Sequence, residues 1–410
     1  MSHSGEHVVI VGAGHAGGSV AALLRQCGCK GPITLIGAEP VPPYQRPPLS
    51  KAWLKGDADH ASLALRPLAF YETNAIALRL GTSVSRIDRA GRPVALGSGE
   101  TLAYDHLILA LGCRARPLAL PGRALAGVLE LRTDADADRL KAVLGPGKRL
   151  AVIGGGYIGL EVAASARALG AAATVIERED RLLARVAGPL LSTFFHDQHR
   201  SRGVAFVLGA GVEALEGANG AVTGVRLSDG GLVPCDAVLI GVGALPNQEL
   251  AAEAGLACDN GIVVDRVART SDPTVFAIGD CTRRPLPLYD RTMRLESVPN
   301  ALEQAKQAAA ALCGRAPPAP EVPWFWSDQY DLRLQIAGLA QGATETVLRG
   351  DPGSGAFALF HLGADDRLLA VEAVNAFPEF MAGRIMIGKR KQIPGAKLAD
   401  VSVSMKDLAA

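Results

Sequence analysis

Apolar runs that lead into glycine-rich turns occur twice along this chain. Residues 7–11 and 150–153 are almost all valine, isoleucine, leucine or alanine, the composition of a buried strand. Each run leads through closely spaced glycines into an alanine- and leucine-rich stretch of helical character. The pattern therefore predicts two units in which a strand, a tight turn and a helix follow one another.

A different pattern follows a proline-rich segment near the end of the chain. Residues 316–320 read Ala-Pro-Pro-Ala-Pro, which is typical of a stiff linker. Beyond it, apolar runs predict strands over 332–339, 357–362 and 368–374, and the segment 380–389 predicts a helix. We therefore expect a separate C-terminal domain that contains both kinds of element.

Both turns carry the spacing G-x-G-x-x-G, the fingerprint of a dinucleotide site. The first glycine permits the bend, the second lets a pyrophosphate approach the backbone, and the third lets the helix pack on the strand. One copy is weak evidence, whereas two copies in matching contexts predict that the protein holds two dinucleotides. The glycines are Gly12, Gly14 and Gly17 in the first turn and Gly154, Gly156 and Gly159 in the second.

Each unit has a glutamate after its second predicted strand, Glu39 in the first and Glu177 in the second. A carboxylate at this place accepts hydrogen bonds from ribose hydroxyls, although a solvated loop glutamate is the alternative interpretation. The charge of Glu177 would repel the 2′-phosphate of NADPH, so we expect a preference for NADH. Arg178 and Arg181 weaken that expectation.

Composition narrows the class of protein. The 410 residues are 49% hydrophobic and include 47 glycines, enough for more than one core. A net charge of +1 and few aromatic residues do not indicate nucleic-acid binding. The apolar stretches are short, and polar residues follow Met1, so we expect a cytoplasmic protein without a membrane segment.

The seven cysteines include no C-x-x-C pair. They therefore form neither a disulfide framework nor a metal-ligand pattern, and we expect no metal site. Flavin disulfide reductases carry redox cysteines soon after the first ribose acid, where this chain has residues 42–51 without a thiol. Electrons are therefore expected to leave the cofactor without a thiol relay.

Seven segments together resemble one family over nearly the whole chain. They are residues 43–51, 107–112, 131–133, 154–161, 275–280, 296–301 and 324–329. The chain resembles the FAD-dependent NADH:ferredoxin reductases of bacterial aromatic-ring dioxygenase and cytochrome P450 systems, the putidaredoxin reductase and biphenyl dioxygenase ferredoxin reductase family. These motifs are far more specific than either fingerprint alone.

The resemblance implies an α/β fold with two Rossmann-like dinucleotide-binding domains, as in glutathione reductase, and a C-terminal α+β interface domain over the flavin. An FAD-binding domain would be interrupted by an NAD-binding domain. The expected boundaries are 1–111 and 240–317 for FAD, 112–239 for NAD and 318–410 for the C-terminal domain.

The resemblance also implies roles for single residues. Besides the fingerprint glycines and Glu39, the expected FAD contacts are Arg46, Lys51, Val84, Arg132, Asp280, Val298 and Trp326. Besides the second fingerprint and Glu177, the expected NAD contacts are Ile158, Glu161, Arg185, Gly243 and Glu296. Taken one at a time, each arginine would more often be a solvated surface charge.

Lys51 and Glu161 are the expected catalytic pair. In the resembled family the two meet beside flavin N5, and their opposite charges offset the cost of burying either one. Glu161 lies near the start of a predicted helix, so an ordinary helix-start carboxylate is the competing interpretation.

The expected activity is electron transfer from NADH through FAD to a [2Fe-2S] ferredoxin of Rieske or plant type, which feeds a terminal oxygenase. Trp326 is expected at the electron exit. Small ferredoxins are usually acidic, so basic residues are candidates for docking: Arg283, Arg284, Arg291, Arg294 and residues 389–391. The alternatives are a rubredoxin reductase or NADH oxidase on the same fold, or a non-enzymatic flavoprotein of the apoptosis-inducing-factor type.

Overall fold

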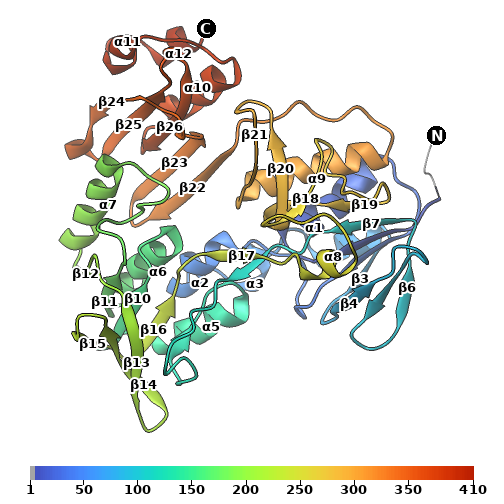
Figure 1. The fold of residues 1–410 in the computed structure, drawn as a ribbon, viewed down its shortest axis with the longest axis horizontal. Coiled ribbons are helices and arrows are strands. Elements are labelled where there is room, and N and C mark those ends of the chain that lie inside the picture. Colours follow the sequence, from blue (N-terminus) through green and yellow to red (C-terminus); the bar gives the residue numbers. More distant parts are fainter. Residues whose placement is uncertain (1–4) are drawn as a thin grey trace.

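The computed structural model describes residues 5–410, so the residues after Met1, on which the expectation of a cytoplasmic protein partly rests, lie outside the described residues. The first predicted unit forms a parallel sheet in the order β19-β7-β1-β2-β3 (Figure 1). Every residue of the central strand is buried, which explains why its sequence shows no polar alternation. The strands are β1 (Val8–Val11), β2 (Ile33–Ile36), β3 (Ile76–Arg79), β7 (His106–Leu109) and β19 (Val275–Ala277).

Two layers cover this first sheet. On one face, helices α1 and α9 pack closely through small side chains such as Ala21 and Ala305. On the other face lies an antiparallel sheet, β4-β5-β6, whose Val94 contributes to the same buried cluster as Val9. The bounds are α1 (His15–Gln26), β4 (Val84–Ile87), β5 (Pro93–Leu96), β6 (Thr101–Ala103) and α9 (Val298–Leu312).

Shorter elements complete the first domain. Among them, β18, β20 and β21 form a small sheet that follows the strand order β18-β20-β21. The bounds are η1 (Pro47–Ser50), α2 (Ala52–Lys55), α3 (His60–Leu63), α4 (Leu68–Thr73), α8 (Glu249–Glu253), β18 (Ile262–Val263), η2 (Gly279–Cys281), β20 (Thr282–Leu286) and β21 (Arg291–Arg294).

The second domain repeats this layering. Its parallel core has the order β12-β11-β10-β16-β9, with α6 against one face and the antiparallel sheet β13-β14-β15 against the other. The bounds are β9 (Val128–Leu129), α5 (Asp134–Val143), β10 (Arg149–Ile153), α6 (Tyr157–Ala168), β11 (Ala172–Ile176), α7 (Pro189–Ser201), β12 (Val204–Val207), β13 (Val212–Ala218), β14 (Ala221–Leu227), β15 (Leu232–Pro234) and β16 (Ala237–Ile240).

Two linkers join these domains and pair with each other. β8 (Cys113–Ala115) and β17 (Ala244–Pro246) run antiparallel, and the backbone N–H of Asn247 donates to the carbonyl of Gly112 at 3.0 Å. β16, a strand of the second sheet, extends to Ile240, the residue at which we expect the first domain to resume. The boundaries at 112, 240 and 318 stay a proposal.

The C-terminal domain is an antiparallel sheet in the order β22-β23-β26-β25-β24. α10 covers one of its faces, and α7 of the second domain packs on the other, where Phe194 meets Phe357 edge to face at 4.9 Å between ring centres. The strands and the helix that the sequence predicts here are confirmed within a few residues. The bounds are β22 (Trp324–Gln329), β23 (Leu332–Gly338), β24 (Glu345–Asp351), η3 (Pro352–Ser354), β25 (Ala356–Leu362), β26 (Leu368–Val374), α10 (Phe377–Gly388), α11 (Gly395–Ala399) and α12 (Met405–Ala409).

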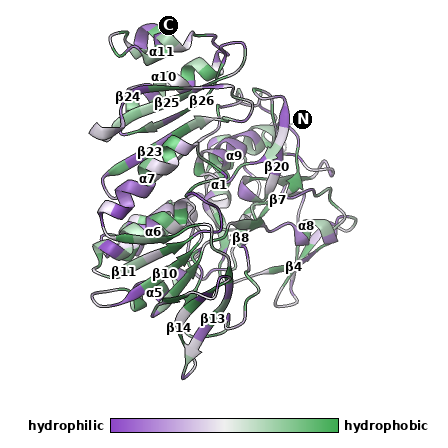
Figure 2. Cartoon of the chain, turned by 60° about the vertical axis from the view of Figure 1, so that its left-hand side comes forward, coloured by the Kyte–Doolittle hydropathy of each residue, from purple (hydrophilic) through white to green (hydrophobic). Residues whose placement is uncertain are grey.

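The architecture is therefore α/β, with two Rossmann-like domains and a smaller α+β domain. Figure 2 shows that the strands of each parallel sheet are mostly hydrophobic, as expected of a layer that is covered on both faces. Within residues 5–410, we find no helix that is both long enough and apolar enough to cross a membrane.

Candidate functional site

The two glycine turns have the same backbone geometry. Gly12 and Gly154 have φ of +111° and +110°, values that L side chains rarely adopt. A Cβ on Gly17 would lie 1.9 Å from the carbonyl oxygen of Gly12, and one on Gly159 would lie 2.3 Å from that of Gly154. The third glycine of each fingerprint is thus required for the helix to approach the turn.

The middle glycines face open space instead. Gly14 and Gly156 are the N-caps of α1 and α6, and neither helix has a side-chain cap. A Cβ on either glycine would meet nothing within 4 Å. The free N–H groups of each first helical turn are therefore open to an anion such as a pyrophosphate.

A cavity of about 650 Å³ lies where the three domains meet. Its volume and its mainly apolar wall are typical of a cofactor site. Its wall includes Gly12 from the first turn, Lys51 after η1, Glu161 on α6 and Trp326 on β22. The other residues expected from the sequence that line it are Gly14, Glu39, Arg46, Arg132, Ile158, Asp280, Glu296 and Val298.

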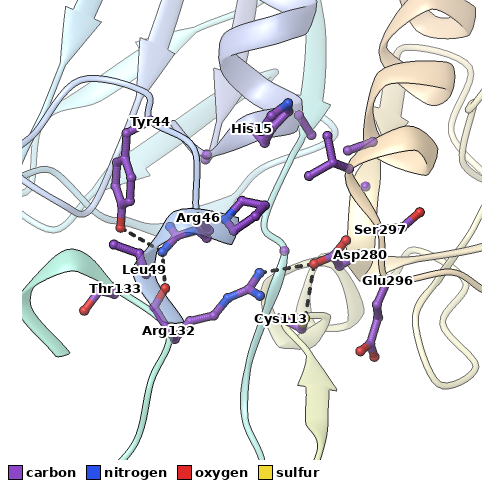
Figure 3. Close-up of a pocket in the computed structure, with 18 of the residues that line it drawn as sticks. His15, Tyr44, Arg46, Leu49, Cys113, Arg132, Thr133, Asp280, Glu296 and Ser297 are labelled. Atoms are coloured by element: carbon purple, nitrogen blue, oxygen red, sulfur yellow. Dashed lines mark hydrogen bonds and ion pairs between the residues drawn. The ribbon is translucent and has the colours of Figure 1, made fainter. Parts of the chain in front are cut away.

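An arginine and a carboxylate meet on one wall of the cavity (Figure 3). Arg132 donates from Nη2 to Asp280 Oδ2 at 3.2 Å. The Cys113 thiol lies 3.5 Å from the same oxygen, and burial raises the pKa of this thiol to about 12. Cys113 was not expected at the site, and its protonated thiol is consistent with electron transfer that uses no thiolate.

Glu39 is fixed by residues of the following loop. Arg46 donates to its Oε1 at 2.5 Å, and the Tyr44 hydroxyl donates to its Oε2 at 2.7 Å. Arg46 also donates to the carbonyl of Arg132 at 2.6 Å, as Figure 3 shows. Each oxygen of Glu39 keeps a free lone pair, so its expected role as a ribose ligand stays open to test.

Glu161, in the second domain, binds residues from the two other domains. Lys51 Nζ and the Ser50 hydroxyl both donate to Glu161 Oε2 at 2.6 Å, and the Ser327 hydroxyl donates to Oε1 at 2.7 Å. The carboxylate thus accepts hydrogen bonds from side chains of the first and C-terminal domains. A carboxylate that only caps a helix start would instead accept from the N-terminal turn of its own helix. The Lys51–Glu161 contact was expected, whereas Ser50 and Ser327 were missed.

Two residues of the cavity wall have buried polar atoms without partners. His15 Nδ1 and the Tyr157 hydroxyl are buried, and neither forms a hydrogen bond within residues 5–410. Burial lowers the pKa of His15, although the charge of Asp280 opposes this effect. Buried polar atoms are normally paired, so these two fit the polar groups of a bound cofactor such as FAD.

The expected NAD residues beyond the cavity cluster at the second fingerprint. Glu177 accepts from the backbone N–H of Gly155 at 2.7 Å, which fixes it beside this turn. Gly243 has φ +112°, and a Cβ there would lie 3.7 Å from the guanidinium of Arg185. The residues that do not contribute to the cavity wall are Gly17, Val84, Gly154, Gly156, Gly159, Glu177, Arg185 and Gly243.

Val84 lies at the start of β4, near the loop that carries Glu39. The backbone N–H of Gly81 donates to the carbonyl of Glu39 at 3.0 Å, so the segment leading into β4 touches this loop. The expected contact of Val84 with FAD stays a prediction.

The expected docking residues are mostly engaged within the protein. Arg284 is only 4% exposed and forms a 2.8 Å ion pair with Glu303, so its assignment to a docking surface is wrong. Lys389 and Lys391 donate to backbone carbonyls of the C-terminal helix. These basic residues stabilise the fold. Nothing in the sequence of residues 389–391 distinguished such internal hydrogen bonds from a docking surface.

A buried histidine predicts how stability depends on pH. His199 is 0% exposed, and burial lowers its pKa to about 4, which outweighs the opposing effect of its bond to Gln329. An unfolded histidine titrates near pH 6.5. Between about pH 6.5 and 4 the unfolded chain therefore binds a proton that the folded chain does not, and acidification lowers the free energy of unfolding by about 3 kcal/mol.

We expect this loss to be absent in a His199→Gln variant. Thermal melting of both proteins at pH 7, 6 and 5 measures it, and the variant should show the smaller fall in melting temperature. His60→Gln is the control, because His60 is exposed. Equal slopes for the wild type and His199→Gln would contradict the prediction.

Comparison with known proteins places the chain in a family. A family model described as pyridine nucleotide-disulphide oxidoreductase matches residues 6–305, and one described as reductase C-terminal matches residues 324–409. The chain is 54% identical to the probable ferredoxin reductase CtmF of Castellaniella defragrans over 408 residues, which cover 99% of this chain and 100% of that protein.

Two solved structures agree over nearly the whole fold. The reductase in a covalent putidaredoxin reductase–putidaredoxin complex matches with a TM-score of 0.96 and 43% identity, covering 99% of this chain and 98% of that one. The ferredoxin reductase for the CYP199A2 system of Rhodopseudomonas palustris also has a TM-score of 0.96, with 44% identity over 99% and 100% of the two chains. With two fingerprints beside one cavity and these matches along its length, the chain belongs to the pyridine nucleotide-disulphide oxidoreductase family, among its FAD-binding, NAD(H)-dependent ferredoxin reductases.

Proposed function

We propose that this protein transfers electrons from NADH through FAD to a [2Fe-2S] ferredoxin that serves an aromatic-ring dioxygenase or a cytochrome P450. The observation that carries this proposal is one cavity that touches both the first glycine turn and the start of α6. The matched complex of a reductase with putidaredoxin supports a ferredoxin as the acceptor.

The residues that would hold FAD fit its chemistry. Gly12 and Gly14 leave room for a pyrophosphate at the start of α1, and Arg132 and Asp280 offer a donor and an acceptor along the cavity wall. When bound, FAD supplies a two-electron acceptor that can release its electrons singly. Lys51 supplies positive charge and Glu161 holds that charge in place, so we assign this pair to the catalytic step.

We assign Ile158, Glu161, Glu177, Arg185, Gly243 and Glu296 to the coenzyme. Glu177 lies beside the second turn. Arg181, which could have bound a 2′-phosphate, donates instead to the carbonyls of Ala184 and Ala187 at 2.9 and 2.8 Å. Arg178 is 81% exposed and pairs with Glu179. These contacts favour NADH over NADPH.

The expected preference is about 10²-fold in kcat/KM, because a carboxylate close to a phosphate costs a few kcal/mol even in a polar setting. Steady-state rates with each coenzyme measure it. Glu177→Gln should narrow this ratio, and Glu213→Gln is the control, because Glu213 is an exposed residue of the same domain. Equal efficiency of the wild type with both coenzymes would remove the prediction.

Trp326 is our candidate for the electron exit. It lines the cavity, and its ring lies 5.6 Å from that of Trp324, on which the guanidinium of Arg384 stacks at 5.1 Å. An aromatic pair that carries a cation and reaches the cavity wall suits an acidic protein partner. Association with ferredoxin should therefore weaken as the salt concentration rises.

A direct experiment tests the proposed function. The purified protein should be yellow, should bleach when NADH is added without air, and should then reduce two [2Fe-2S] ferredoxins for each NADH. Reduction of rubredoxin but not of ferredoxin would favour the rubredoxin reductase alternative. Very slow bleaching, without reduction of either acceptor, would favour a protein that binds NADH without turning it over.

We also propose a cytoplasmic location. All seven cysteines are free, which suits a reducing compartment, and NADH is supplied there.

A further inference from the structure

A continuous chain of buried hydrogen bonds leads from Glu161 away from the cavity. Ser327 Oγ lies 2.7 Å from Glu161 Oε1, and Gln329 Nε2 lies 3.1 Å from Ser327 Oγ. Gln329 Oε1 lies 2.7 Å from His199 Nε2, and the Tyr330 hydroxyl lies 3.3 Å from His199 Nδ1. These hydrogen bonds therefore connect α6 with strand β22 of the C-terminal domain and with helix α7.

The direction of every bond in this chain follows from its first member. An ionised Glu161 can only accept, so the single proton of the Ser327 hydroxyl must be donated to it. Ser327 then accepts from the amide NH₂ of Gln329, which turns the amide oxygen toward His199. Nε2 of His199 must carry the ring proton, and Nδ1 is left to accept from the Tyr330 hydroxyl.

All of these donors therefore point toward Glu161. Bonds aligned in this way polarise one another, and the effect is strongest in a low-dielectric interior. The three middle members are at most 1% exposed, so little solvent competes with them. A buried carboxylate needs such donors to stay ionised, and Glu161 is only 6% exposed.

We propose that Ser327, Gln329 and His199 are positioning residues for Glu161, which hold its carboxylate in the orientation that binds Lys51. The proposal rests on the role assigned to Glu161 under the proposed function. None of the three residues is needed as a proton carrier, because the amide of Gln329 passes protons poorly.

The surroundings of His199 suit this role. Arg202, which follows the last residue of α7, and His196 on α7 both lower its pKa further beyond the effect of burial. From the turn after β22 it meets Tyr330, whose ring is stacked by Arg202 at 4.7 Å. A neutral imidazole is the form that the direction of the chain requires.

The first test measures the tautomer of His199 in the flavin-loaded protein. Nitrogen-15 NMR of labelled histidines should show a neutral ring protonated at Nε2, assigned by its loss in His199→Gln. Gln329→Glu should raise the pKa of His199, because a carboxylate in place of the amide favours the imidazolium. A ring protonated at Nδ1 in the wild type would overturn the proposal.

The second test measures whether Ser327 acts through Glu161. Ser327→Ala should slow flavin reduction by NADH by about tenfold or somewhat more, the lower end of the effect of one hydrogen bond to a charged group, with the KM for NADH within about twofold of wild type. Ser327→Thr keeps the hydroxyl and should restore most of the rate. Asp328→Asn is the control on the same strand, because Asp328 lies 3.9 Å from Arg333 and contributes nothing to the chain.

A double-mutant comparison separates the possible failures. In a Glu161→Gln background, Ser327→Ala should cause no further slowing, and an equal slowing in both backgrounds would overturn the proposal. A wild-type rate in Glu161→Gln itself would refute the catalytic role of Glu161. The tautomer of His199 would then still test whether the hydrogen bonds from His199 to Glu161 all donate toward Glu161.

Discussion

A Gly17→Ala protein is expected to purify without flavin, whereas Gly159→Ala is expected to be yellow and yet fail to bleach with NADH. In each case the added methyl would overlap a backbone carbonyl, at 1.9 Å for Gly17 and 2.3 Å for Gly159, so α1 or α6 must move away from its turn. We expect affinity for the matching dinucleotide to fall by about 10³-fold, since the pyrophosphate loses aligned N–H donors. The absorbance ratio of flavin to protein and the bleaching by NADH or dithionite report the two losses.

Gly14→Ala and Gly156→Ala are the controls for this prediction. A Cβ at either position meets nothing in the protein within 4 Å, so circular dichroism and thermal stability should stay close to wild type. Any loss of binding in these variants comes from contact with the dinucleotide itself. The assignment of the two turns would fail if Gly17→Ala kept its flavin, or if Gly159→Ala kept its flavin and still bleached at the normal rate with NADH.

Lys51→Met and Glu161→Gln are expected to shift the flavin midpoint potential in opposite directions. Loss of Glu161 leaves the ammonium without its 2.6 Å counter-charge and favours the more negative reduced flavin, so the potential rises. Loss of Lys51 leaves the carboxylate alone, so the potential falls. A charge near a site of intermediate polarity gives shifts on the order of 50 mV, or about 2 kcal/mol for two electrons.

Both variants should also be reduced by NADH about 10²-fold more slowly, because the pair orients groups in the wall of the cavity. Redox titration and anaerobic stopped-flow absorbance measure the two effects. The control is Glu100→Gln, which breaks an exposed 3.4 Å ion pair with Arg79 outside the cavity wall and should change neither quantity. Shifts of the same sign in the two variants would contradict the electrostatic role of this pair.

The dinucleotide turns could be predicted because their determinants are local. Gly17 lies five positions after Gly12, and the overlap that Gly17 and Gly159 avoid is with a carbonyl of their own turn. The strands β23, β25 and β26 of the C-terminal domain could also be predicted, since their apolar residues are continuous in the sequence, whereas β24, which is mostly exposed, was not. The small antiparallel sheets that cover the two parallel sheets were not predicted, because short strands that are only partly buried have a weak apolar pattern.

The partners of Glu161 were beyond reach for a different reason. Ser50 and Ser327 come from two other domains, 111 and 166 positions away, and a serine hydroxyl carries no pattern of its own. One signal was present in the sequence. Ser327 and Gln329 follow Phe325 at every second position, so the three side chains lie on the same face of strand β22, where apolar residues are expected. Polar residues on a face that packs against another domain point to a buried network.

The paired linkers β8 and β17 have a mechanical consequence. Two independent tethers would let the second domain twist in any direction, whereas two hydrogen-bonded strands bend easily only across their flat side. Any opening between the domains to admit the coenzyme is therefore a rotation about a single axis at these paired strands. The contacts of Glu161 on α6 with the two other domains oppose that rotation.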